Sequence, residues 1–466
     1  MTIEESQKLA KIFETAGADA IHARVEVYTI RKSRRWQTDL GYMKYDNTHF
    51  PDVALYPEPP PGLPSDTVDV THHGAGAWIP AAAAIKKVVN IPVIAVGRID
   101  PDMGEKILRQ GMADFIYMNR RLMADHDLPH KLRDGKLEDI APCTACMTCV
   151  AQWDFYEKYP GVMCRVNAAL GREKEYELKP AVKQKKVVVI GGGPGGMEAA
   201  RVAALRGHKV ILFEKDMLGG SANIAAVVKG TEREDILKLV DYLKIQIAKA
   251  GVDIREGKEA TVEIVRLIKP DVVIVATGGR HKDPEIPGIH NSNVLTSQML
   301  HDQIKKYMKI TGARLMTKLA TKYVPVGRNV VIIGGGIHGC QTAEFLVKRG
   351  RKVTILEGGS IIGEGLLKHQ LRQQLLDWLE KKNTIIMSDV KFEEITEEGI
   401  IISTGESERQ TVFADTIITA LPLVPDNSLV DAFKDKAPEV YAVGDCNEPA
   451  YIANAISDGY RIARII

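Results

Sequence analysis

Two copies of one pattern constrain the fold of this chain more than any other feature of its sequence. The first copy reads KVVVIGGGPGGMEAARVAALRGHKVILFEK, and the second, about 143 residues further on, reads NVVIIGGGIHGCQTAEFLVKRGRKVTILEG. Each copy has an apolar strand, a glycine-rich turn, a helix and a second strand that ends in an acidic residue. This order is typical of dinucleotide-binding α/β folds. The duplication therefore predicts two Rossmann-like dinucleotide-binding domains in an α/β protein.

The glycines and acids of both copies suit a bound nucleotide. Three glycines let a tight turn pass beneath a pyrophosphate and deliver it to a helix N-terminus, and a carboxylate accepts hydrogen bonds from a ribose but repels a phosphorylated one. Glu357 therefore predicts NAD(H) rather than NADP in the second copy, and a merely structural glycine turn is the alternative. The predicted cofactor-binding residues are Gly191, Gly193, Gly196 and Glu214 in the first copy, and Gly334, Gly336, Gly339 and Glu357 in the second.

Two further segments, DVVIVATGG and VYAVGDC, each read as a buried strand that ends in small residues, and they place Gly278 and Asp445 at strand ends. Two nucleotide units in one chain are what a module that binds both a flavin and a nicotinamide needs. Cys340 and Cys446 stand alone in the sequence. We interpret these two cysteines as small buried residues rather than a redox pair.

Four of the six cysteines lie in CTACMTCVAQWDFYEKYPGVMC, at positions Cys143, Cys146, Cys149 and Cys164. A structural zinc site usually pairs two C-x2-C knuckles, whereas three cysteines at successive two-residue spacings suit three corners of a cubane cluster. Cys164 would supply the fourth corner. The spacing predicts a [4Fe–4S] cluster, with zinc or no metal as the alternatives.

The first 133 residues or so alternate helix-like and strand-like segments. We expect helices over 3–16, 79–89 and 101–111, and strands over 18–27, 91–97 and 113–118. That order predicts parallel strands with covering helices. The proline-containing loop over 29–78 is either a stiff surface excursion or an active-site cover.

Arginines follow two successive predicted strands of this first segment. Gly97 and Arg98 come after one strand, and Asn119 and Arg120 come after the next. If the segment is part of a (β/α)8 barrel, the phosphate of a ligand would lie at the loops after the last two strands. The recurrence favours phosphate binding, and exposed surface charge is the alternative.

The composition limits the classes of partner molecule that we expect this chain to bind. The chain has 62 Lys and Arg against 60 Asp and Glu, without a basic stripe, so we expect a small-molecule substrate and no nucleic acid. No apolar run reaches the roughly 18 residues that a membrane span needs. The opening MTIEESQKLAK reads as an acidic helix start rather than a signal peptide. We therefore expect no membrane association and a cytoplasmic location.

The segments AVGRID, NRRLMAD, CTACMTC and GGGPGGMEAA, in this order, resemble the multidomain branch of the Old Yellow Enzyme family, which includes 2,4-dienoyl-CoA reductase and trimethylamine dehydrogenase. The resemblance covers essentially the whole chain. It implies an FMN barrel, a [4Fe–4S] cluster and a half that binds FAD and NAD(H). The implied domains are 1–140 for a partial TIM-barrel FMN and substrate domain, 141–184 for the cluster and a linker, 185–325 with 441–466 for FAD, and 326–440 for NAD(H).

The resemblance also implies roles for single residues. Asp445 would contact the ribityl chain or pyrophosphate of FAD, and Tyr28 would be the proton donor to the substrate, with a packing role as the alternative. Asn119 departs from the family, which usually has glycine there. Only the last three barrel strands can be placed. The chain is therefore a fragment, is completed by a partner chain, or carries a vestigial barrel.

The resemblance implies an NADH:flavin oxidoreductase. Electrons would run from NADH through FAD and the cluster to FMN, which would reduce the activated C=C bond of an enoyl-CoA or enoate. One alternative is an oxidative demethylase that acts on an amine and donates electrons to an electron-transfer flavoprotein. Another alternative is an electron-input subunit that docks onto a larger complex.

Overall fold

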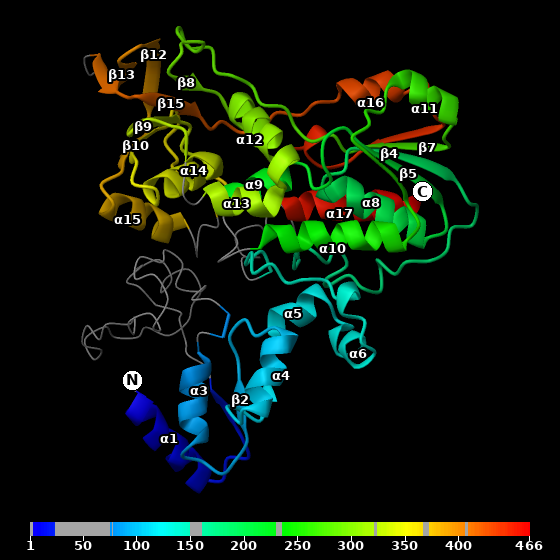
Figure 1. The fold of residues 1–466 in the computed structure, drawn as a ribbon, viewed down its shortest axis with the longest axis vertical. Coiled ribbons are helices and arrows are strands. Elements are labelled where there is room, and N and C mark those ends of the chain that lie inside the picture. The colour runs from blue at the N-terminus through cyan, green and yellow to red at the C-terminus, as the bar shows by residue number, and fades with distance from the viewer. Residues whose placement is uncertain are drawn as a thin grey trace. The chain divides into compact units, whose positions relative to one another are not determined.

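The computed structural model describes residues 3–23, 75–76, 78–149, 161–229, 235–320, 324–366, 372–405 and 409–466. The chain divides into two compact units, one ending at Asn119 and the other beginning at Arg120. Figure 1 shows the secondary structure of both. Tyr28 and most of the loop over 29–78 lie outside the described residues.

The first unit alternates helices and short strands. Its elements are α1 (Ile3–Thr15), β1 (Ile21–Ala23), α3 (Ile79–Lys86), β2 (Val93–Ala95), α4 (Pro101–Arg109) and β3 (Phe115–Ile116). The strands are parallel and lie in the order β1-β2-β3. Val93 and Ala95 of the central strand are fully buried. The predicted β/α alternation with parallel strands is therefore confirmed for this unit.

The second unit contains two parallel five-stranded sheets. The first has the order β16-β7-β4-β5-β6, and its strands are β4 (Lys186–Ile190), β5 (Lys209–Glu214), β6 (Asp253–Glu256), β7 (Val272–Val275) and β16 (Glu439–Ala442). The second has the order β11-β10-β9-β15-β8, and its strands are β8 (Val294–Leu295), β9 (Asn329–Ile333), β10 (Lys352–Leu356), β11 (Ile385–Met387) and β15 (Thr416–Thr419). The central strands are buried on both faces, as parallel sheets covered by helices require.

The two sheets place equivalent strands at equivalent positions. In each, the strand before the glycine turn is central, and the strand that ends in the acid lies beside it. The outermost place is taken by β16 in the first sheet and by β8 in the second. Because β8 lies within the range 185–325 yet pairs with the second sheet, that domain boundary does not follow the strand pairing. The division into domains stays a proposal.

The remaining described elements are helices, 3-10 turns and one antiparallel sheet. The helices are α5 (Asn119–Ala124), α6 (Leu128–Arg133), α8 (Pro194–Leu205), α9 (Ser221–Lys229), α10 (Ile236–Lys249), α11 (Val262–Ile268), α12 (Ser297–Thr311), α13 (Ala313–Ala320), α14 (Ile337–Val347), α15 (Gln373–Lys381), α16 (Ser428–Phe433) and α17 (Ile452–Ile465), with 3-10 turns η2 (Leu137–Asp139) and η4 (Gly444–Cys446). An antiparallel sheet contains β12 (Val390–Thr396), β13 (Gly399–Thr404) and β14 (Gln410–Phe413). None of the described helices is both long and apolar enough to span a membrane.

Candidate functional site

The first glycine turn requires glycine at two of its three predicted positions. Gly191 has a φ of +108°, and a Cβ there would lie 2.3 Å from the carbonyl oxygen of Ala276. A Cβ on Gly196 would lie 2.0 Å from the oxygen of Gly191. Because any side chain would collide with the backbone, these two residues let α8 pack closely against the sheet.

Gly193 has a different role, because its place in the turn is open. It is the N-cap of α8, no side chain caps the helix there, and a Cβ on it would meet no described atom within 4 Å. A helix N-terminus has unpaired backbone N–H groups and a positive dipole end, which suit a phosphate. The space in front of Gly193 therefore fits a pyrophosphate.

The second glycine turn repeats the first. Gly334 has a φ of +110°, and its Cβ would lie 2.7 Å from the oxygen of Ala420, while a Cβ on Gly339 would lie 1.8 Å from the oxygen of Gly334. Gly336 is the N-cap of α14, again without a side-chain cap. One contact differs, since the N–H of Ile337 donates to the carbonyl oxygen of Glu364 at 2.7 Å. The second turn suits a nucleotide by the same geometry.

The two acids have a structural role that sequence reasoning missed. Glu214 accepts hydrogen bonds from the backbone N–H groups of Gly192 and Asp216, both at 2.7 Å. Glu357 accepts from Gly335 at 2.6 Å and from Gly359 at 2.8 Å. The only sequence signal for this role is that each acid stands at the same distance from its glycine turn in both copies.

The exposure of the two acids differs. Glu214 is 8% exposed, whereas Glu357 is only half-buried. Each carboxylate oxygen has two lone pairs, so a ribose hydroxyl can still donate to either acid. Glu357 is therefore the more accessible of the two to a ribose.

The segments DVVIVATGG and VYAVGDC lie side by side, next to the first glycine turn. Strand β7, which precedes Gly278, pairs with both β4 and β16. A Cβ on Gly279 would lie 3.3 Å from the oxygen of Asp445. Burial raises the pKa of the Asp445 carboxyl, although its hydrogen bond from the N–H of Ala450 at 3.1 Å opposes this. The structure thus brings Gly278 and Asp445 to the edge of the sheet that carries the glycine turn.

A cavity of about 550 Å³ lies at the carboxyl end of β15 in the second sheet. It is lined by residues 421–424, which follow that strand, and by residues 282–285. Arg280 and Val424 exchange two backbone hydrogen bonds of 2.9 Å beside it. Ligands of open α/β sheets bind at the carboxyl ends of the strands, so this cavity lies where a ligand of the second sheet is expected.

The four clustered cysteines face one another. Burial, and to a lesser extent the neighbouring thiols of Cys146, Cys164 and Cys143, raise the pKa of Cys149 to about 12. Burial raises the pKa of Cys164 to about 11 as well. Bound iron would keep these sulfurs as thiolates. The fold therefore joins the distant Cys164 to the other three thiols.

The loop over 143–149, which contains the first three cysteines and is called the cysteine loop below, has a strained backbone. Polar groups lie near the cysteine sulfurs. Ala145 and Met147, the residues on either side of Cys146, have φ values of +57° and +62°. The N–H of Val166 donates to the sulfur of Cys164 at 3.4 Å. The buried hydroxyl of Thr144 has no hydrogen-bond partner among the described residues. Strain and an unpartnered buried hydroxyl are both common where a bound group completes a site.

Four neighbouring cysteines are the ligands both of a cubane cluster and of a structural zinc site. Within the described parts of the chain, no group of three or more His, Cys, Asp or Glu side chains is arranged to hold a metal ion. A single zinc ion needs four sulfurs about 2.3 Å from one centre. A cubane cluster instead keeps its cysteines at separate corners. The four thiols lie near enough to raise the pKa of one another, and four cysteines are the donor set of a [4Fe–4S] cluster.

The predicted phosphate-binding residues are divided between the two units. Gly97 and Arg98, in the first unit, have consecutive positive φ values of +135° and +52°. Asn119 is exposed at the start of α5. Arg120 belongs to the second unit, where its Nη1 lies 2.7 Å from the sulfur of Met147. The sequence did not indicate that Arg120 would contact the cysteine loop.

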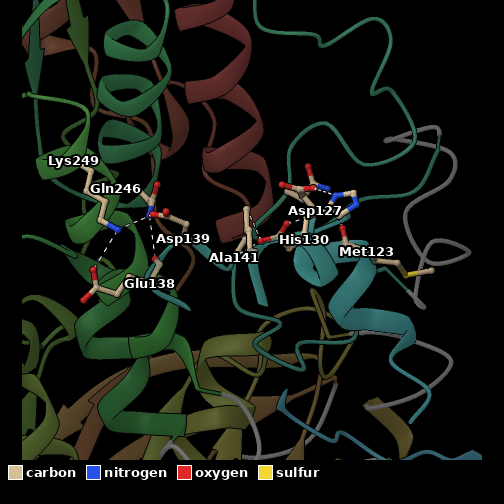
Figure 2. Close-up of polar contacts among 11 residues, drawn as sticks. Met123, Asp127, His130, Glu138, Asp139, Ala141, Gln246 and Lys249 are labelled. Carbon is tan, nitrogen blue, oxygen red and sulfur yellow. Dashed lines mark hydrogen bonds and ion pairs between the residues drawn. The ribbon is translucent and has the colours of Figure 1, made fainter. Parts of the chain in front are cut away.

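Polar contacts anchor the cysteine loop on both sides (Figure 2). Asp125, 4% exposed, accepts hydrogen bonds from the N–H of Ala141 and from Lys131, both at 2.7 Å. On the other side, Lys249 and Gln246 of α10 donate to the carboxylate of Asp139 at 2.8 and 3.1 Å. Sequence reasoning missed these residues, because no local spacing marks them.

A second anchor joins the residues that follow Cys164 to helix α5. The side-chain amide of Asn167 donates to the backbone oxygen of Met123 at 3.0 Å. Asn167 lies three residues after Cys164, and Met123 lies on α5. The chain just after Cys164 is thereby held to α5, which precedes Cys143 in the sequence.

Comparisons with known proteins agree with this geometry. Residues 185–459 match the family of pyridine nucleotide-disulphide oxidoreductases. A protein named NADH oxidase from Thermoanaerobacter brockii is 33% identical over 99% of this chain and 64% of its own length. A cinnamate reductase from Clostridium sporogenes is 30% identical over 100% of this chain and 62% of its own. The chain thus spans less than two thirds of either relative.

Among solved structures, a 2-naphthoyl-CoA reductase matches with a TM-score of 0.73 and 33% identity, over 86% of this chain and 58% of that one. These matches confirm the resemblance to the multidomain branch of the Old Yellow Enzyme family and the predicted α/β fold class. They also agree with flavin and nicotinamide nucleotide as the cofactors of such proteins.

Proposed function

Because this chain belongs to the pyridine nucleotide-disulphide oxidoreductase family, we propose that it binds FAD at its first glycine turn and NAD(H) at its second. The observation that carries the proposal is the repetition of one set of backbone contacts in both turns, each with an uncapped helix N-terminus. Gly191, Gly193, Gly196, Glu214, Gly278 and Asp445 would hold FAD, and Gly334, Gly336, Gly339 and Glu357 would hold NAD(H).

The half-buried Glu357 supports NADH over NADPH. Its carboxylate is already fixed by two backbone N–H groups, so it cannot turn away from a 2′-phosphate without losing both hydrogen bonds. Two negative charges would then face each other, which is unfavourable. A ribose hydroxyl, in contrast, can donate to a free lone pair of the carboxylate.

We further propose that Cys143, Cys146, Cys149 and Cys164 hold a [4Fe–4S] cluster and that Gly97, Arg98, Asn119 and Arg120 bind the phosphate of FMN. When bound, these groups supply a route for electrons from NADH to an activated C=C bond of an enoate or enoyl-CoA. The names cinnamate reductase and 2-naphthoyl-CoA reductase support such substrates. Tyr28 as proton donor stays a prediction.

Disulphide reduction is not proposed, although the family name includes it. The two cysteines outside the loop, Cys340 and Cys446, are both fully buried. Each sulfur donates to a backbone carbonyl oxygen, Gly335 in one case and Val275 in the other. They are the small buried residues that the sequence predicted.

The proposal is tested by purifying the chain without oxygen and quantifying FAD, FMN, iron and sulfide before NADH is added. We expect FAD, FMN and about four irons per chain, with the flavin and cluster absorbance bleached by NADH and restored by cinnamate or an enoyl-CoA. FAD and iron without FMN would instead indicate an electron-input subunit that needs a partner chain. Bleaching by an amine such as trimethylamine but not by NADH would indicate the oxidative demethylase.

A further inference from the structure

We propose that Arg120 is a positioning residue for the cysteine loop and that its charge raises the reduction potential of the cluster bound there. The inference rests on the proposed [4Fe–4S] site. It assigns to Arg120 a role beyond phosphate binding, because the side chain contacts the loop itself.

The contact joins Arg120 to the centre of the cysteine motif. Its Nη1 lies 2.7 Å from the sulfur of Met147, which stands between Cys146 and Cys149 in the sequence. Met147 is 5% exposed and has a φ of +62°. Because the backbone there is left-handed and the side chain is buried, the contact fixes the loop in a conformation that a non-glycine residue seldom adopts alone.

Arg120 also brings a charge that no carboxylate of the described residues neutralises. Among the residues that the structure describes, Arg120 makes no ion pair, and a thioether is only a weak hydrogen-bond acceptor. Other cations of this region are paired: Lys131 lies 2.7 Å from Asp125, and Lys249 lies 2.8 Å from Asp139. The guanidinium therefore contributes a positive charge beside the sulfurs.

That charge acts on the one-electron reduction of the cluster. Four thiolates would give a bound [4Fe–4S] centre a net negative charge, and a one-electron reduction would make it more negative. A nearby cation stabilises the reduced form more than the oxidised form, so it raises the reduction potential. A phosphate bound to the other N–H donors of the guanidinium would offset part of this charge, but replacing Arg120 by Gln still removes a cation from beside the sulfurs.

The test compares Arg120→Gln, Arg120→Lys and Arg133→Gln with the unchanged chain, all as purified without oxygen. Arg133 lies on α6 with its side chain 70% exposed, so Arg133→Gln removes the same charge from the same segment at the surface. The midpoint potential is measured by a redox titration followed by the EPR signal of the reduced cluster. Iron, sulfide, FAD and FMN are quantified in every sample.

We expect Arg120→Gln to lower the midpoint potential clearly, Arg120→Lys to lower it less because the charge remains, and Arg133→Gln to leave it unchanged. Equal potentials in Arg120→Gln and the unchanged chain would overturn the inference while leaving the cluster in place. If Arg120→Gln retains no iron, the midpoint potential of Arg120→Lys is compared with that of the unchanged chain instead. A higher potential in Arg120→Lys would contradict the role of the charge. Absence of iron from the unchanged chain would refute the proposed cluster itself.

Discussion

The carboxylate of Asp125 accepts a hydrogen bond from the backbone N–H of Ala141, with its Oδ2 2.7 Å from the nitrogen (Figure 2). The same oxygen lies 2.7 Å from the Nζ of Lys131. Asp125 is buried, and Ala141 lies two residues before the first cysteine. One carboxylate therefore fixes where the cysteine loop begins.

Replacing Asp125 by Ala should destabilise the chain and weaken its hold on iron. The change leaves the N–H of Ala141 and the ammonium of Lys131 without their acceptor, and breaking a buried pair in this way costs about 3 kcal/mol of unfolding free energy. Urea unfolding and iron content measure the two effects. Asp127→Ala is the matched control, because its partner His130 is 66% exposed and little change is expected. Equal losses in both variants would contradict the anchoring role of Asp125.

Gly193→Ala and Gly196→Ala should separate cofactor binding from folding. A Cβ at Gly193 meets no described atom within 4 Å, so that variant should keep the stability of the unchanged apo-chain and lose FAD. A Cβ at Gly196 lies 2.0 Å from the oxygen of Gly191, so this variant should lose about 2 kcal/mol of stability. Thermal unfolding of apo-protein and FAD content per chain are the measurements. Full FAD content in a folded Gly193→Ala variant would contradict the proposed flavin site.

Glu357→Gln should weaken NADH binding about tenfold, because a hydrogen bond to a charged acceptor contributes about 1.5 kcal/mol. An amide has one acceptor oxygen where the carboxylate has two, so Gly335 or Gly359 also loses a partner. The KM for NADH in flavin reduction should rise while kcat changes little, and discrimination against NADPH should fall. Glu380→Gln, an exposed change on α15, is the control. Unchanged KM values for both nucleotides would remove Glu357 from the site.

Stability should fall as the pH is lowered from about 6.5, because burial lowers the pKa of His301 to about 3. His301 lies on α12 with its Nδ1 3.1 Å from the Nε2 of His281, and the charges of His281, Lys305 and His338 contribute to this lowering of its pKa. Between these two pKa values the unfolded chain binds a proton that the folded chain does not. Stability should therefore fall by at most about 1.4 kcal/mol per pH unit from this residue.

The control for this pH dependence is a second histidine variant. His301→Gln should reduce the slope of stability against pH between pH 6.5 and 5, as measured by urea unfolding at each pH. His130→Gln, at a side chain that is 66% exposed, should leave the slope in place. An identical slope in the chain and in His301→Gln would show that other groups cause the pH dependence.

Local patterns in the sequence predicted the parts of the site that depend on neighbouring residues. The glycine spacing of both turns, the acids after the second strands and the parallel β/α order are all encoded within about thirty residues. The burial of Cys340 and Cys446 was also predicted, because isolated cysteines in apolar surroundings behave as small core residues. Such features are readable because backbone sterics and hydrophobic periodicity act over short distances along the chain.

The outer strands of the two sheets show where local patterns end. Strand β8 pairs with β15 across more than a hundred residues, and β16 pairs with β7 across a similar distance. No local spacing indicates which sheet receives such a short strand. The pairing is decided by which edge is free once the other strands have packed.

The sequence alone therefore determined two glycine turns of the dinucleotide-binding type and a set of four cysteines, because each depends on spacing within a short segment. Only the tertiary structure decided that Arg120 contacts Met147, that Asp125 fixes the start of the cysteine loop, and that Glu214 and Glu357 bind the turns they follow. These contacts join side chains to groups 16 to 27 residues away, at positions set by the packing of helices and sheets. The two glutamate contacts recur at the same spacing in both copies, whereas no local repeat marks those of Arg120 and Asp125.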